Sequence, residues 1–167
     1  MINTVTVIIL GIAWTVSWPA LSAEVEMKTL NCGATGFFVF APEVAHINPG
    51  ETVNFVAVDK GHDVHSVPGM IPEGAEPFDA KMSQNIKVMF TVPGVYVVAC
   101  KPHTAMGMVG VVVVGDPINI DTIDPSTLPG KARTKLDSLL ADSGGCRPRI
   151  RDDLAHHSDL ISLGVPG

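Results

Sequence analysis

The chain has 167 residues, a net charge of −6 at pH 7 and a hydrophobic content of 46%, and only 17% of its residues are charged. This length is sufficient for one domain with a buried core, and an abundance of valine favours a β-rich fold. The acidic balance excludes a general electrostatic attraction to nucleic acid.

The N-terminal segment has the pattern of an export signal. Residues 1–23 contain no charged side chain, are apolar through their middle and end in the small residues Ser22 and Ala23. This pattern predicts a signal peptide cleaved near Ala23, and therefore a soluble periplasmic protein without membrane contact. An uncleaved membrane anchor is the alternative, because about 20 apolar residues can span a bilayer.

Short strand-like segments separated by proline- and glycine-containing turns follow the signal segment. Val53 and Phe55 would share one face of a strand, as would Val88 and Phe90. Such a series predicts a β-sandwich or barrel. The expected strands lie within residues 24–30, 37–42, 47–58, 87–92, 95–100 and 108–115.

One helix is expected after a proline-broken connector. Pro129 and Gly130 begin it, and apolar side chains at helical spacing form one face over about residues 130–142. A single helix cannot form a second domain, so we predict that it packs on the sandwich within one domain, residues 24–143. Residues 144–167 form a tail without a convincing apolar period, and disorder is one interpretation of it. The apolar face of the expected helix comprises Ala132, Leu136, Leu139 and Leu140.

The most informative stretch is CKPHTAMGM, residues 100–108, between two expected strands. A thiol, an imidazole and a thioether together favour copper, and two histidines, a cysteine and a weak axial methionine make a blue-copper site. The stretch supplies one histidine, so a second must come from a neighbouring strand. His62 and His65 are the candidates. Their odd spacing would place them on opposite faces of a strand, and His62, beside the flexible Gly61, is better placed.

These residues resemble the pseudoazurins, type 1 blue-copper proteins of the cupredoxin fold. The matching stretches are DKGH (59–62), GMIPEGAEPF (69–78), FTVPGVY (90–96) and CKPHTAMGMVGVVVVGD (100–116). The resemblance implies a mainly β, cupredoxin-like Greek-key β-sandwich with a C-terminal helical extension. It also implies one copper ion held by His62, Cys100, His103 and Met108, which leaves Met106 as the methionine that does not bind the ion.

The implied function is that of a monomeric electron carrier without enzymatic activity. The resemblance implies redox partners, such as a copper nitrite reductase as acceptor and a cytochrome c or a dehydrogenase as donor. A copper storage or delivery module is the alternative function, and a copper oxidoreductase is disfavoured because only six histidines are present. For Cys100, a structural disulfide, a zinc site and a Cys/His protease are the competing interpretations, and none of them requires methionine.

A docking surface is also implied by the resemblance. It would place the ring edge of His103 at the surface, inside an apolar patch of Pro102, Met106 and Phe38, although core packing is an equal alternative for Phe38. Fewer lysines than usual would surround this patch, so steering toward acidic partners should be weak. Lys60 and Lys81 match family lysines, whereas Cys32, Asp79 and Ala99 stand where family members commonly carry lysine, and Lys101 is an additional candidate.

Two further departures from the family pattern concern Asp63 and the extra cysteines. The family normally has Asn at the position of Asp63, and its amide helps tie the ligand loops together. A carboxylate has no donor to offer, and its charge should lower the reduction potential. Cys32 and Cys146 are not needed for the copper site. In an exported protein they could form a disulfide, remain free or link two molecules.

Overall fold

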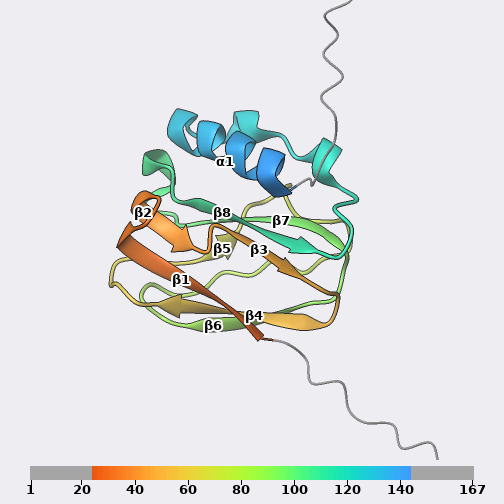
Figure 1. Ribbon diagram of the computed structural model, residues 1–167, viewed down its shortest axis with the longest axis horizontal. Coiled ribbons are helices and arrows are strands. Elements are labelled where there is room, and N and C mark those ends of the chain that lie inside the picture. The colour runs from red at the N-terminus through yellow and green to blue at the C-terminus, as the bar shows by residue number, and fades with distance from the viewer. Residues whose placement is uncertain (1–23, 144–167) are drawn as a thin grey trace, which may run out of the picture.

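The computed structural model describes residues 24–143, which fold into two four-stranded β-sheets packed face to face, with one helix over the second sheet (Figure 1). The predicted mainly β sandwich with a C-terminal helix is therefore confirmed. The first sheet has the order β2-β1-β4-β6 and the second the order β3-β8-β7-β5. The strands are β1 (Glu24–Gly33), β2 (Gly36–Ala41), β3 (Val44–Ile47), β4 (Glu51–Ala57), β5 (His65–Ser66), β6 (Ile86–Phe90), β7 (Gly94–Ala99) and β8 (Val109–Val114).

Both sheets are mixed. β1 pairs with β4 and β3 pairs with β8 in parallel, and the remaining neighbours are antiparallel. Parallel neighbours cannot be joined by a tight hairpin, so the chain crosses between the sheets, as in a Greek key. Short 3₁₀ turns occur at Thr104–Met106, Ile120–Thr122 and Pro125–Thr127.

Strands β7 and β8 are buried on both faces, and this explains their uninterrupted apolar sequences. All six residues of each strand are buried. On one face, Tyr96, Val98 and Val112 pack in the core between the sheets. On the other face, Val97 and Val111 pack beneath the helix. A strand covered on both sides needs apolar residues at every position, whereas a strand with one solvated face would alternate.

The helix α1 (Gly130–Ser143) covers the second sheet. It begins at the predicted residue, and Ala132, Leu136 and Leu139 are buried as the apolar spacing indicated. Together with Ile123 they form a second core against β7 and β8. No helix in the described part of the chain has the length and apolar character needed to cross a membrane.

We expect the second core to be a substantial source of stability. Leu136 is fully buried, so Leu136→Ala should lower the free energy of unfolding by about 2–5 kcal/mol, through lost apolar burial and a residual cavity. Chemical denaturation of the metal-free protein measures this change. Asp137→Ala on the exposed side of the same helix is the control and should change stability by less than about 0.5 kcal/mol. Equal effects of the two substitutions would show that α1 does not pack as described.

Candidate metal centre

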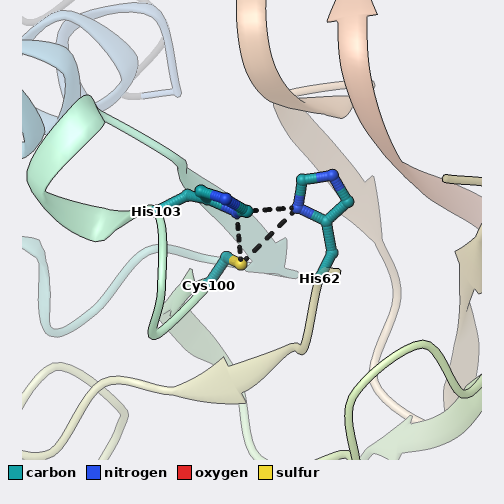
Figure 2. Close-up of side chains that lie close together, drawn as sticks. All are labelled: His62, Cys100 and His103. Atoms are coloured by element: carbon teal, nitrogen blue, oxygen red, sulfur yellow. Dashed lines mark hydrogen bonds between the residues drawn. The ribbon is translucent and has the colours of Figure 1, made fainter. Parts of the chain in front are cut away.

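Three potential metal ligands meet at one end of the sandwich. The Cys100 Sγ lies 3.4 Å from the His103 Nδ1 and 3.7 Å from the His62 Nδ1, and the two Nδ1 atoms are 3.0 Å apart. Figure 2 shows the two imidazole rings converging on the sulfur from different loops. These separations suit donors that share one ion at bond lengths of about 2.0–2.3 Å.

A short loop between β7 and β8 carries two of the three donors. Cys100 directly follows β7, and its backbone carbonyl accepts hydrogen bonds from the N–H groups of His103 (3.0 Å) and Thr104 (2.7 Å) and from the Thr104 hydroxyl (2.6 Å). Gly107 ends the 3₁₀ turn with a φ of 100°, in the left-handed region that favours glycine. These contacts fold the loop back so that His103 faces the cysteine.

Met108 lies at the end of the same loop and is fully buried. Its backbone N–H donates to the His103 carbonyl at 3.2 Å, and its carbonyl accepts the Cys100 N–H at 3.2 Å. Met106, in contrast, is 44% exposed. The buried position of Met108 suits a fourth ligand, and the exposure of Met106 suits a surface contact.

The other donor, His62, is oriented by a side chain that the sequence did not single out. The His62 ring is buried, and its Nε2 lies 3.0 Å from the Oδ1 of Asn31 in β1. An amide oxygen only accepts hydrogen bonds, so Nε2 carries the proton and Nδ1 presents a free lone pair to the site. Asp59 accepts the Asn31 backbone N–H at 2.7 Å and holds this strand end against the His62 loop.

The His62 backbone is held independently by Ser83. The Ser83 N–H donates to the His62 carbonyl at 2.7 Å, and the Ser83 hydroxyl accepts the Gly61 N–H at 2.9 Å. Two neighbouring segments thus fix both the position of the loop and the rotation of the ring. His65 lies three residues further on, pairs with Ala99 in β5–β7, and does not belong to the cluster of converging donors.

Asp63 connects the two ligand loops. Its buried carboxylate accepts the backbone N–H of Lys101 at 2.7 Å. A carboxylate has no donor to offer, but this connection needs only an acceptor, because the donor is the Lys101 N–H. Asp63 therefore supports the geometry of the site while placing a negative charge beside Cys100.

The electrostatic surroundings of the site differ for the thiol and the imidazole. Burial raises the pKa of Cys100 to about 11, and the negative charge of Asp63 also raises it. Hydrogen bonds from the backbone of Asp63 and His103 act in the opposite direction and lower the pKa, but their effect is smaller than that of burial. Burial lowers the pKa of His62, with a further contribution from His103. In the metal-free protein at neutral pH, Cys100 is thus a thiol and His62 a neutral imidazole, ready to coordinate through nitrogen.

The surface next to the site is formed by the predicted patch residues. Phe38 stacks on His103, with ring centroids 4.4 Å apart and an interplanar angle of 15°. Phe38 is also partly buried against the core. It therefore combines the two roles considered for it, contact with His103 at the surface and packing in the core. Its φ of 54° is unusual for a residue with a side chain and directs the ring onto the imidazole. Pro102 and Met106 are exposed on the loop that carries His103.

The charged residues around this surface are mixed in sign. Lys60 and Lys81 are exposed and form no ion pair within the described residues. Lys101 pairs with Asp79 at 2.5 Å, so its charge is largely offset. Weak steering toward acidic partners stays a prediction.

Cys32 is an exposed free thiol near the β1–β2 hairpin, and Cys146 lies outside the described residues. The hairpin and the first turn of α1 lie at the same end of the molecule, whereas the last turn of α1 lies away from them (Figure 1). The pairing of Cys32 with Cys146 therefore stays an untested prediction.

Known proteins resemble the chain in both sequence and structure. Residues 26–115 match the family model of copper binding proteins, plastocyanin/azurin family. The chain is 42% identical to a pseudoazurin from Paracoccus pantotrophus over 124 residues, which cover 74% of this chain and 86% of the relative. A solved pseudoazurin from Sinorhizobium shares 41% identity with a TM-score of 0.68, covering 73% of this chain and 98% of that one. A pseudoazurin structure from Methylobacterium extorquens AM1 shares 37% identity with the same TM-score, covering 72% of this chain and 99% of that one. The chain thus belongs to the pseudoazurins, within the plastocyanin/azurin family of copper-binding proteins.

Proposed function

We propose that this protein is an exported, non-enzymatic one-electron carrier whose copper ion is held by His62, Cys100, His103 and Met108. The observation that supports this most strongly is the convergence of one thiol and two imidazole nitrogens at 3.0–3.7 Å on a rigid sandwich. A copper ion at this site would supply a one-electron couple between Cu(II) and Cu(I). The mixed sulfur and nitrogen donor set suits both oxidation states.

The protein's contribution is to keep the donors in place during each transfer. The His62 ring is fixed by Asn31, the two ligand loops are joined through Asp63, and Cys100 and Met108 are joined by a backbone hydrogen bond. Since none of these contacts needs to change when an electron moves, little reorganisation is required. The exposed edge of the patch at Met106 gives a small contact area, which suits rapid dissociation of a partner.

The burial of the site favours a carrier over a storage or delivery module. His62, Cys100 and Met108 are each at most 1% exposed. Delivery of copper by ligand exchange requires donors that an acceptor protein can reach. Here only His103 among the four is partly exposed, so electrons can leave through its ring while the ion stays enclosed.

The compartment and the partners belong to the same proposal. The apolar N-terminal segment supports export to the periplasm, and membership in the pseudoazurins supports a redox-protein partner. We propose a copper nitrite reductase or similar terminal reductase as acceptor, with a cytochrome c or a dehydrogenase as donor. The mixed charges around the patch lead us to expect a shallower dependence of association on salt than a complete lysine ring would give.

The direct test is the colour of the copper-loaded protein. One equivalent of Cu(II) should produce an intense visible absorption band from the Cys100 thiolate, which ascorbate bleaches and hexacyanoferrate(III) restores. Cys100→Ala should abolish the band, because the thiolate is its source, whereas Cys32→Ser should leave it unchanged. A band that survives Cys100→Ala, or no band in the wild-type protein, would refute the proposed site.

The hydrogen bond from His62 to Asn31 should contribute to metal affinity. Asn31→Ala removes the acceptor that fixes the ring and its tautomer, so we expect the affinity for Cu(II) to fall by about 10–100-fold. Competition against a chelator measures this change. Asn48→Ala, which alters a turn residue paired with Glu51, is the matched control. Equal affinities for Asn31→Ala and the wild type would show that packing alone orients His62.

The charge of Asp63 should lower the reduction potential. Asp63→Asn keeps an oxygen that can accept the Lys101 N–H but removes a negative charge beside the sulfur. We therefore expect the potential to rise by on the order of tens of millivolts, as measured by protein-film voltammetry. Asp142→Asn, an exposed position in the last turn of α1, is the control for net charge. An unchanged or lower potential in Asp63→Asn would contradict this assignment.

A further inference from the structure

Glu43 lies outside the metal centre and joins three separate elements of the fold. It follows β2 and immediately precedes β3, and its carbonyl accepts the Val111 N–H of β8 at 2.9 Å. Both oxygens of its carboxylate have partners. Oε1 accepts the Thr35 hydroxyl at 2.8 Å, and Oε2 pairs with the Lys135 Nζ at 2.6 Å. Glu43 therefore connects β8, the turn between β1 and β2, and α1.

The pair with Lys135 is more enclosed than any other ion pair formed within residues 24–143. The side chains of Lys135 and Glu43 are 28% and 13% exposed, whereas every side chain in the other three pairs is at least 45% exposed. Partial burial reduces screening by salt and water, so this pair can hold a fixed geometry where an exposed pair would contribute little. The hydrogen bond from Thr35 also keeps the carboxylate from turning toward solvent.

The contact between Thr35 and Glu43 closes a short loop that contains Phe38. The two ends are eight residues apart in the chain, and an extended chain of that length would span roughly 26 Å, so the segment must bend back. Phe38, near its middle, has a φ of 54°, far from an extended conformation. Its ring lies on His103, with the ring centroids 4.4 Å apart. Glu43 is thus placed to hold the bend that presents this ring to the ligand.

Strand pairing does not hold the backbone of Phe38 itself. In the ladder between β1 and β2, Leu30 pairs with Val39 and Cys32 pairs with Phe37, and Phe38 between them is skipped. A residue with a side chain stays at positive φ only where surrounding contacts outweigh the strain. The closure of the segment at Glu43 supplies such a contact.

The helix that carries Lys135 also adjoins the ligand loop. A Cβ placed on Gly107 would lie 3.7 Å from the Lys131 Cβ and 3.7 Å from the Lys131 carbonyl oxygen, so the loop backbone and the first turn of α1 are neighbours. Lys131 and Lys135 are four residues apart and therefore lie on the same side of the helix. This side of α1 thus adjoins the loop of His103 directly and reaches the segment of Phe38 through Glu43.

We propose that Glu43 is a positioning residue of the metal centre. Anchored by Lys135, it holds the segment of Phe38 so that the aromatic ring stays stacked on His103, and α1 in this way sets the orientation of the exposed ligand. The inference rests on the proposed function, because the orientation of His103 matters to electron transfer only if His103 binds copper. Glu43 is not among the converging donors, so it acts through Phe38. The competing explanation is that packing against the core alone holds the ring.

The experiment measures the stack in the full chain without metal. An aromatic ring stacked at 4.4 Å shifts the NMR signals of the His103 ring protons upfield. Phe38→Leu removes the aromatic ring, so the change in this variant at constant pH gives the full size of the shift. We expect Glu43→Ala to lose most of the shift. Lys135→Met should lose a smaller part, because Thr35 still binds the carboxylate.

Conservative variants and a matched control separate positioning from general stability. Lys135→Arg keeps the ion pair and should keep the wild-type shift. Glu43→Gln keeps an acceptor for Thr35 but loses the ion pair, so it should resemble Lys135→Met, and it decides the question if Glu43→Ala does not fold. Lys87→Met breaks the exposed pair with Glu24 on the other sheet and should leave the His103 signals unchanged.

The copper-loaded protein provides a second measurement. A reoriented His103 changes how the donors surround the ion, so the relative intensities of the visible bands should change in Glu43→Ala and stay constant in Lys87→Met. If the wild-type protein forms no copper band, the proposed function fails. The ring signals of the metal-free protein still decide whether Glu43 positions Phe38, so the two proposals fail separately.

Three results would overturn the inference. Unchanged His103 signals in Glu43→Ala, beside a clear change in Phe38→Leu, would show that core packing alone holds the ring, whatever the stability of the variant. Equal changes in Lys87→Met and Lys135→Met would assign the effect to net charge. Unchanged signals in Phe38→Leu would show that the stack does not persist in solution.

Discussion

The structure depends on one constraint, namely that two loops separated by 38 residues must hold a nitrogen and a sulfur 3.7 Å apart in a buried site. The strand pairing brings the loops to the same end of the sandwich, but pairing alone does not set ångström-scale distances. That precision comes from polar contacts between the loops. The Asp63 carboxylate binds the Lys101 N–H, and Asn31 fixes the His62 ring. Each contact joins elements that are distant in the chain, so the site exists only in the complete fold.

The same arrangement explains why the core is divided in two. The core between the sheets includes Cys100 and Met108, so ligands and packing residues belong to one rigid cluster. The second core attaches α1 to the outer face of β7 and β8. Because both faces of these strands are buried, the loop between them has little freedom at either end. A rigid frame of this kind is what a metal site with small reorganisation requires.

The sequence was sufficient to predict most of the strands, the helix and the cysteine–histidine loop, because these features have local patterns, but β3 was not among the expected strands. Continuous apolar sequences indicated β7 and β8, the spacing of Ala132, Leu136 and Leu139 indicated α1, and the soft and nitrogen donors of the loop indicated copper. The requirement for a second histidine then directed attention to His62. The separation of Met108 from Met106 came from family resemblance, and the structure adds that Met108 is buried and Met106 exposed.

Contacts between distant segments could not be predicted in this way. Asn31 lies 31 residues before His62, in a strand where no local pattern marks it as a partner of the site. The connecting role of Asp63 depends on the position of the Lys101 N–H relative to its carboxylate, which no local pattern in the sequence shows.

The stacking of Phe38 on His103 has a consequence for how the protein acquires its ion. The other three donors are enclosed, so an incoming ion can reach the site only where His103 reaches the surface. For the imidazole to swing aside, it must first slide out from under the aromatic ring, whose backbone is held in an uncommon conformation. Phe38 should therefore slow the entry of the ion into the site, and for the same reason it should slow the loss of the ion.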